Sequence, residues 1–126
     1  MADKVTWFEL PAHDTARAGK FYSDVFGWST SDMGGGSLMA ITTPSDDQGT
    51  PSEAGAINGD ISPRSEGFDK PLIVITVEDI DAKIDMVKNA GGQVVLPRKE
   101  VPEMGIVWAI VADTEGNRVG ILQNKQ

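Results

Sequence analysis

The chain has 126 residues, enough for one domain with a substantial core but short for two independent ones. It contains no cysteine, which excludes disulfides, zinc–thiolate sites and thiol nucleophiles and makes the cytoplasm the expected compartment. The chain has 11 Lys and Arg against 19 Asp and Glu, which gives a net charge of −8. It contains no basic run and no long apolar stretch. We therefore expect neither a nucleic acid nor a membrane partner.

The first predicted element is a strand over residues 5–11, where polar and apolar side chains alternate with a period of two. Phe8 and Leu10 fall on one side of this strand, and Trp7 and Glu9 fall on the other. The helix that follows should pack on the Phe8 and Leu10 side, so we expect Trp7 and Glu9 to face away from it.

A helix should follow this strand, because Asp14 is a good N-cap and Gly27 is a good stop. Its predicted buried stripe is made of Ala18, Phe21, Tyr22 and Val25.

Three further strands complete the first half of the chain, over residues 28–32, 37–43 and 55–59. The three glycines at 34–36 predict a hairpin turn rather than a phosphate site, because no helix follows them. Residues 44–53 are polar and without periodicity, which predicts a loop over a ligand site, and residues 61–70 predict a link.

The second half repeats this order. A strand over residues 72–77 precedes Asp79, the predicted N-cap of a second helix that buries Ile80, Ile84 and Val87 and stops at 91–92. The remaining predicted strands cover residues 94–96, 106–112 and 119–122, with a charged turn region at 97–103.

One offset relates the two halves. Asp14 and Asp79 are 79 − 14 = 65 residues apart, and the glycines at 27 and 92 are also 92 − 27 = 65 apart. The same offset superposes Gly55 on Gly120. We predict two β-α-β-β-β modules, residues 4–60 and 70–124, within a single domain 1–126, although two unrelated strand–helix pairs could coincide in this way.

Four stretches carry a family resemblance: residues 8–11 with Asp14, and residues 21–28, 77–82 and 113–117. Together they resemble the vicinal oxygen chelate superfamily, which includes glyoxalase I, extradiol dioxygenases and bleomycin-resistance proteins. Thr114 replaces a proline that is usual in the last stretch. The resemblance implies an α+β fold in which two tandem βαβββ modules form a cupped mixed sheet around a cavity, with helices on the outer face, in a homodimer.

In the metal-dependent members of that family, histidine and glutamate ligands come from the first and last strands of each module. Aligning the motifs places these positions at Trp7 and Leu72, and near Gly55 and Gly120. None of these side chains can bind a metal, and the single histidine, His13, lies at the helix entrance. We therefore expect no metal and no cofactor.

The first functional hypothesis is a metal-independent binding protein for a small molecule, such as a cationic aromatic compound, with Glu9 as the polar anchor. Its predicted ligand-binding residues are Trp7, Glu9, Trp28, Met39, Leu72, Met104 and Trp108. Ordinary core packing is the alternative for each of the apolar residues and is the favoured one for Leu72 and the two methionines, and an exposed strand-edge carboxylate is the alternative for Glu9.

The second hypothesis is a glyoxalase-type lyase or isomerase acting on a small oxygenated substrate, with Glu9 as the only candidate catalytic base. A third is an interaction domain that pairs with another chain through its edge strands.

Overall fold

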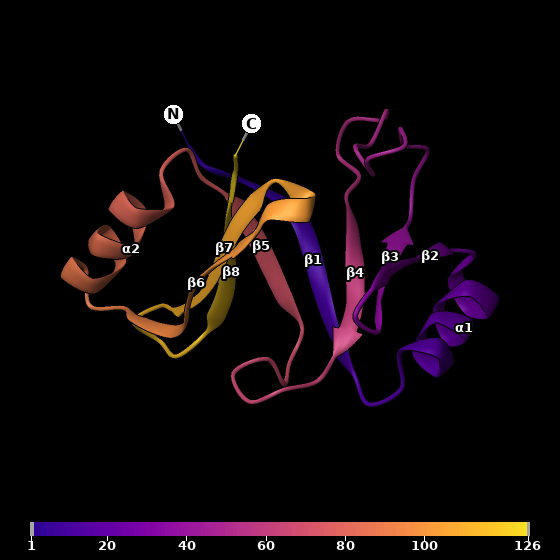
Figure 1. Cartoon of the computed structure of the whole chain (residues 1–126), viewed down its shortest axis with the longest axis horizontal. Coiled ribbons are helices and arrows are strands. Elements are labelled where there is room, and N and C mark those ends of the chain that lie inside the picture. The colour runs from indigo at the N-terminus through magenta and orange to yellow at the C-terminus, as the bar shows by residue number, and fades with distance from the viewer. Residues whose placement is uncertain (1, 126) are drawn as a thin grey trace. The chain divides into compact units, whose positions relative to one another are not determined.

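A computed structural model describes residues 2–125 and contains two successive β-α-β-β-β modules (Figure 1). The elements of the first are β1 (Lys4–Ala12), α1 (Thr15–Phe26), β2 (Ser29–Gly34), β3 (Ser37–Ile41) and β4 (Asn58–Pro63). The elements of the second are β5 (Leu72–Thr76), α2 (Ile80–Asn89), β6 (Gln93–Val101), a short 3-10 helix (Pro102–Met104), β7 (Ile106–Ala112) and β8 (Arg118–Asn124). The predicted α+β class and tandem βαβββ modules are confirmed.

The chain folds into two compact units. The N-terminal unit comprises Trp7–Pro71, and the C-terminal unit comprises the described residues before Trp7 and from Leu72 onward. Strands follow the order β2-β3-β4-β1 in the N-terminal unit and β5-β8-β7-β6 in the C-terminal unit. In each, the first strand runs parallel to the last and the other pairs are antiparallel.

Both helices begin where the sequence predicts. The Asp14 carboxylate accepts the Arg17 N–H at 3.0 Å, and the Asp79 carboxylate accepts the Ala82 N–H at 3.1 Å, so each satisfies a backbone donor that the first helical turn leaves unpaired. Gly27 ends α1 with a left-handed φ of 76°. Neither helix within residues 2–125 has the length and apolar character needed to cross a bilayer.

The core of the N-terminal unit lies between α1 and one face of its sheet. Its buried residues are Ala12, Ala40 and Ile61, and the half-buried side chains of Phe8, Leu10, Ala18, Tyr22, Trp28 and Leu38 pack around them. Phe8 and Leu10 therefore face the helix, as predicted.

The predicted stripe of α1 is wrong at two positions, because Phe21 is 54 % exposed and Val25 is 56 % exposed. The helix turns its Ala18 and Tyr22 line toward the sheet, and Gly19 lies so close to Leu38 that a methyl group would crowd it. In the C-terminal unit the predicted stripe is confirmed, since Ile80, Ile84 and Val87 all pack on the core.

Two strands, β4 and β6, differ most from the prediction. The fourth strand covers Asn58–Pro63 rather than 55–59, and β6 continues through the predicted turn region to Val101. Glu9 on β1 pairs with Asp60 on β4, and Val74 on β5 pairs with Gly120 on β8 in the same way. The offset between the two modules is therefore 74 − 9 = 65 on their first strands but 120 − 60 = 60 on their last strands. This change in offset corresponds to a longer β3–β4 loop in the N-terminal unit.

Candidate functional site

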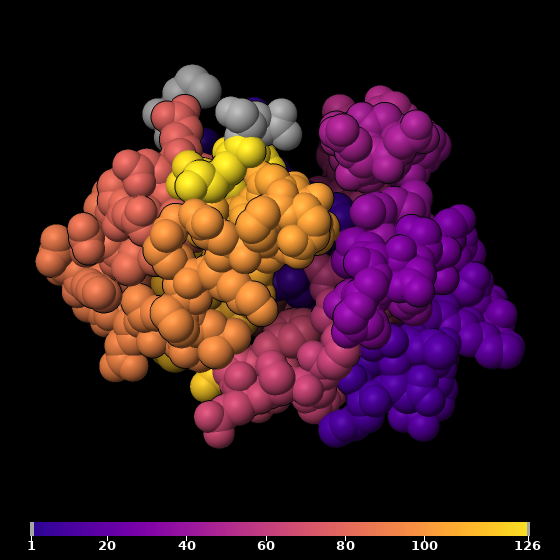
Figure 2. Space-filling model, in the orientation of Figure 1, coloured from indigo at the N-terminus to yellow at the C-terminus, as the bar shows by residue number. Residues whose placement is uncertain are grey.

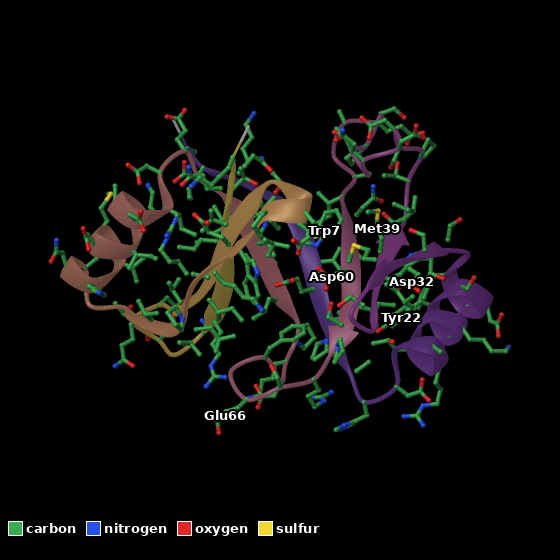
Figure 3. The ribbon with its side chains drawn as sticks, viewed as in Figure 1. Trp7, Tyr22, Asp32, Met39, Asp60 and Glu66 are labelled. Carbon is green, nitrogen blue, oxygen red and sulfur yellow. The ribbon has the colours of Figure 1, made fainter. Side chains whose placement is uncertain are left out.

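The face of the N-terminal sheet that points away from α1 carries the candidate functional side chains. Trp7 and Glu9 come from β1, Asp60 from β4 and Met39 from β3, and Figure 3 shows Trp7, Met39 and Asp60 on neighbouring strands. The register pairs Asp60 with Glu9 on one side and with Met39 on the other, which places these three side chains on one face. The predicted outward orientation of Trp7 and Glu9 is confirmed. We call these four residues the Trp7 face.

Gly59 sets how closely β4 approaches β1. A side chain at this position would collide with the backbone oxygen and the ring of Phe8, so only glycine fits between the strands there. The close approach brings Asp60 opposite Glu9 on the other side of the sheet.

Asp60 is a buried carboxylate, 5 % exposed, and its partners are specific. One carboxylate oxygen accepts the Trp7 Nε1–H at 2.7 Å, and the other accepts the Ser62 hydroxyl at 2.6 Å. The half-buried Glu9 carboxyl also hydrogen-bonds to Asp60. A charge-assisted network of this kind is what allows a carboxylate to remain buried.

Burial raises the pKa of Glu9 from 4.5 to about 9, and the charge of Asp60 and the hydrogen bond to it act in the same direction. At neutral pH Glu9 is therefore protonated where it faces Asp60. The expected polar anchor Glu9 thus lies beside a second carboxyl group, Asp60, which the sequence analysis did not include.

The other predicted ligand-binding residues lie elsewhere. Trp28 is on the helix-facing side of the N-terminal sheet, with its ring stacked on Tyr22 at 4.7 Å between centroids and tilted against Phe8 at 5.4 Å. The sheet thus separates Trp28 from the Trp7 face, because the stacking partners of Trp28 are the core residues that pack against α1.

Three predicted residues belong to the C-terminal unit. Leu72 is buried in β5, and Met104 is 50 % exposed at the end of the 3-10 helix. Trp108 pairs with Leu122 on the face of β7 that points away from α2. Of the seven predicted residues, Trp7, Glu9 and Met39 are therefore brought together within one unit. His13 is exposed beside the N-cap of α1.

The donor atoms present do not fit a metal ion. Within residues 2–125 no three His, Cys, Asp or Glu side chains lie close enough together to hold one. Gly55 lies in a turn before β4 and has no side-chain donor, and the last-strand residue that pairs with Glu9 is Asp60, so the N-terminal unit offers two carboxyl groups. In the C-terminal unit the corresponding pair is Val74 and Gly120, which offer no ligand atoms.

Sequence reasoning missed Asp60 and its neighbour Asn58. The signal was present, because Asn58, Asp60 and Ser62 alternate with Gly59 and Ile61 as polar and apolar faces of a strand do. Pro63 and the charges after it made this stretch resemble a link between modules.

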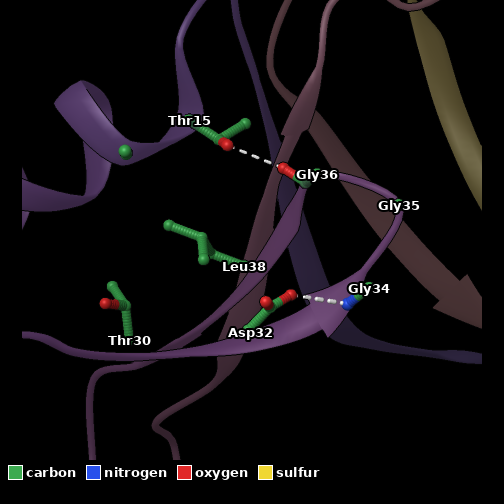
Figure 4. Close-up of a pocket in the computed structure, with 8 residues that line it drawn as sticks. Thr15, Thr30, Asp32, Gly34, Gly35, Gly36 and Leu38 are labelled. Atoms are coloured by element: carbon green, nitrogen blue, oxygen red, sulfur yellow. Dashed lines mark hydrogen bonds between the residues drawn. The ribbon is translucent and has the colours of Figure 1, made fainter.

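A hollow of about 450 Å³ lies between the first turn of α1 and the β2–β3 hairpin (Figure 4). Two of the polar side chains that line it are already hydrogen-bonded to the hairpin backbone. The Asp32 carboxylate accepts the Gly34 N–H at 2.7 Å, and the Thr15 hydroxyl donates to the Gly36 carbonyl at 2.6 Å. We therefore assign this hollow a structural role.

Comparison with known proteins identifies the class. Residues 4–121 match the family model of the Glyoxalase/Bleomycin resistance protein/Dioxygenase superfamily, and the chain belongs to this superfamily. The resemblance found in the sequence motifs is thereby confirmed.

Two curated relatives and one solved structure are similar to this particular chain. "Putative glyoxylase CFP32" of Mycobacterium bovis is 31 % identical over 93 % of this chain and 44 % of the relative, so the chain spans about half the length of that protein. A glyoxylase-like domain-containing protein of Didymella fabae is 32 % identical over 90 % of this chain and 88 % of the relative. A variant of Streptomyces coelicolor methylmalonyl-CoA epimerase, bound to 2-nitronate-propionyl-CoA, has a TM-score of 0.67 at 16 % identity over both full chains, which supports the fold alone.

Proposed function

We propose that this protein binds a small organic molecule without a metal, on the Trp7 face, and that the preferred ligand is a planar aromatic cation. The observation that carries the proposal is the hydrogen bond of 2.7 Å from the Trp7 indole to the buried Asp60 carboxylate, beside the protonated Glu9 carboxyl. It joins an aromatic surface to a single, well-partnered negative charge.

The composition of the Trp7 face matches a small-molecule site. Trp7 and Met39 are half-buried and offer apolar contact area, while Glu9 and Asp60 supply a few placed polar atoms. An indole ring attracts a cation through its electron-rich face, and the Asp60 charge adds to this attraction because it is partly shielded from water. The acidic balance of the chain, 19 acidic against 11 basic side chains, acts in the same direction at longer range.

Isothermal titration of chelator-treated protein with benzamidine and with benzamide tests the proposal. The two probes share one planar shape, and only benzamidine carries a positive charge, so the proposal predicts that benzamidine binds more tightly. Asp60→Asn removes the charge of the pair and should weaken benzamidine binding about tenfold or more, while benzamide binding changes little. Glu66→Gln is the matched control, because Glu66 is exposed and points away from the Trp7 face (Figure 3).

Equal affinity for the two probes would remove the cationic ligand from the proposal. Saturable binding of either probe only after Zn²⁺, Ni²⁺ or Mn²⁺ is added would contradict metal-independent binding as a whole.

A glyoxalase-type lyase or isomerase is the second candidate, favoured by the raised pKa of Glu9 beside the Asp60 carboxyl and by relatives described as glyoxylases. Paired carboxyls of different pKa are a common arrangement for moving a proton to and from a carbon beside a carbonyl group. Production of lactoyl thioester from the hemithioacetal of methylglyoxal and glutathione, lost in Glu9→Gln but not in Glu66→Gln, would favour this candidate. The absence of turnover, both with and without an added divalent metal, would contradict this candidate and leave the binding function.

A further inference from the structure

The loop between β3 and β4, residues 42–57, is fastened by one fully buried side chain, Asn58. The Asn58 side-chain oxygen accepts the Thr42 N–H at 2.8 Å, and its amide nitrogen donates to the Ser45 hydroxyl at 2.7 Å and to the Gly49 carbonyl at 2.9 Å. A buried amide without these partners would be costly, so the burial of Asn58 and the position of the loop depend on each other.

The loop is also organised internally. The Asp46 carboxylate accepts the Gln48 and Thr50 N–H groups, both at 2.9 Å, and Ser45 and Pro51 form an isolated antiparallel bridge. The space-filling view shows this magenta segment as a compact lobe at one end of the N-terminal unit (Figure 2).

Gly49 is the point at which the loop meets the Trp7 face. It is buried with a left-handed φ of +82°, and a Cβ atom built there would lie 3.0 Å from the Met39 sulfur and 3.8 Å from a ring carbon of Trp7. The Gly49 backbone therefore lies against both side chains, and its carbonyl group is the one that Asn58 holds.

We propose that Asn58 is a positioning residue that holds the β3–β4 loop closed against Trp7 and Met39, so that the loop controls the access of small molecules to the Trp7 face. The inference rests on the proposed function for the choice of face, but the closure can be measured without a ligand. Thr42, Ser45 and Gly49 separate from Asn58 when the loop opens, and the Trp7 ring then becomes accessible.

Amide hydrogen exchange of the ligand-free protein tests the closure. In Asn58→Ala the Gly49 and Ser52 amides should exchange about tenfold faster or more, because the loop opens locally once its anchor is lost. The Arg64 amide, which donates to the Ala12 carbonyl outside the loop, should exchange as before. Equal acceleration at Arg64 would mean that Asn58 only stabilises the core, and would overturn the inference.

Acrylamide quenching of Trp7 fluorescence tests the control of access. Substituting Trp28→Phe and Trp108→Phe leaves Trp7 as the only tryptophan, since the chain has three. Adding Asn58→Ala to this background should raise the quenching constant about twofold, because the open loop uncovers the ring. An unchanged constant, together with faster loop exchange, would show that the loop does not control access.

Gly49→Ala provides a second variant in case Asn58→Ala does not fold. The new methyl group strains a backbone with positive φ and crowds Met39, so it should open the loop with Asn58 intact and increase quenching in the same way.

If benzamidine binds, both variants should release it faster. Failure of benzamidine to bind the wild-type protein counts against the proposed function, whereas the exchange and quenching results decide the role of Asn58.

Discussion

At the scale of single residues, the raised pKa of Glu9 beside Asp60 is the main electrostatic feature of the Trp7 face. Two adjacent carboxylates would repel each other strongly with little water between them, and keeping one protonated removes that repulsion. Trp7 and Ser62 both donate hydrogen bonds to the Asp60 carboxylate, one to each oxygen. Glu9 is consequently a hydrogen-bond donor at neutral pH.

This arrangement predicts a pH dependence of stability. Between pH 4.5 and 9 the unfolded chain loses the Glu9 proton and the folded protein keeps it, so the folded state binds more protons and its stability falls as the pH rises. The slope from this group should be about 1 kcal/mol per pH unit or less, since Glu9 is only partly shielded from water. Glu9→Gln, which cannot ionise, should remove this slope and be the more stable protein at pH 8.

Urea unfolding at pH 5, 6, 7 and 8 measures the effect, with Glu66→Gln as the control that should follow the wild-type curve. Parallel curves for wild type and Glu9→Gln would show that Glu9 ionises normally in the folded state.

At the scale of elements, the pairing of β1 with β4 builds the Trp7 face, and Gly59 makes that pairing possible. Gly59→Ala places a methyl group against the Phe8 backbone, which is not a flexible neighbour, so the two strands must separate. We expect a loss of about 2 kcal/mol or more in the free energy of unfolding, larger than the usual cost of a surface substitution.

Chemical denaturation of Gly59→Ala beside Ser29→Ala, on exposed β2, provides the comparison. Similar stabilities for the two variants would mean that β4 can accommodate a side chain and that the strand approach is looser than described.

The sequence predicted elements best where local chemistry decides them. Asp14 and Asp79 cap the helices, and the alternation around Phe8 orients β1. The prediction failed at β4, because a fixed offset of 65 ignores the extra length of the β3–β4 loop. A buried Asp60 can be expected only once its hydrogen-bond partners are known. The raised pKa of Glu9 depends on the same tertiary contact, so no local pattern could reveal it.

At the scale of the whole molecule, we propose that the chain forms a homodimer, as the family resemblance implies and as closed two-fold symmetry favours. Light scattering after size-exclusion chromatography should give about 27 kDa, twice the chain mass of 13.5 kDa. A mass near that of one chain at micromolar concentration would contradict the dimer without affecting the site, because the Trp7 face is built within one unit.

The metal-free Trp7 face is tested most directly by nuclear magnetic resonance of the three indole N–H groups, with the Trp7 signal assigned by Trp7→Phe. In the presence of a chelator, titration with benzamidine should shift the Trp7 signal saturably, because its N–H is bonded to Asp60, while the Trp28 signal, from the opposite face of the sheet, stays in place. A Trp7 signal that does not move, or that moves only when a divalent metal is supplied, would contradict the proposed metal-independent site.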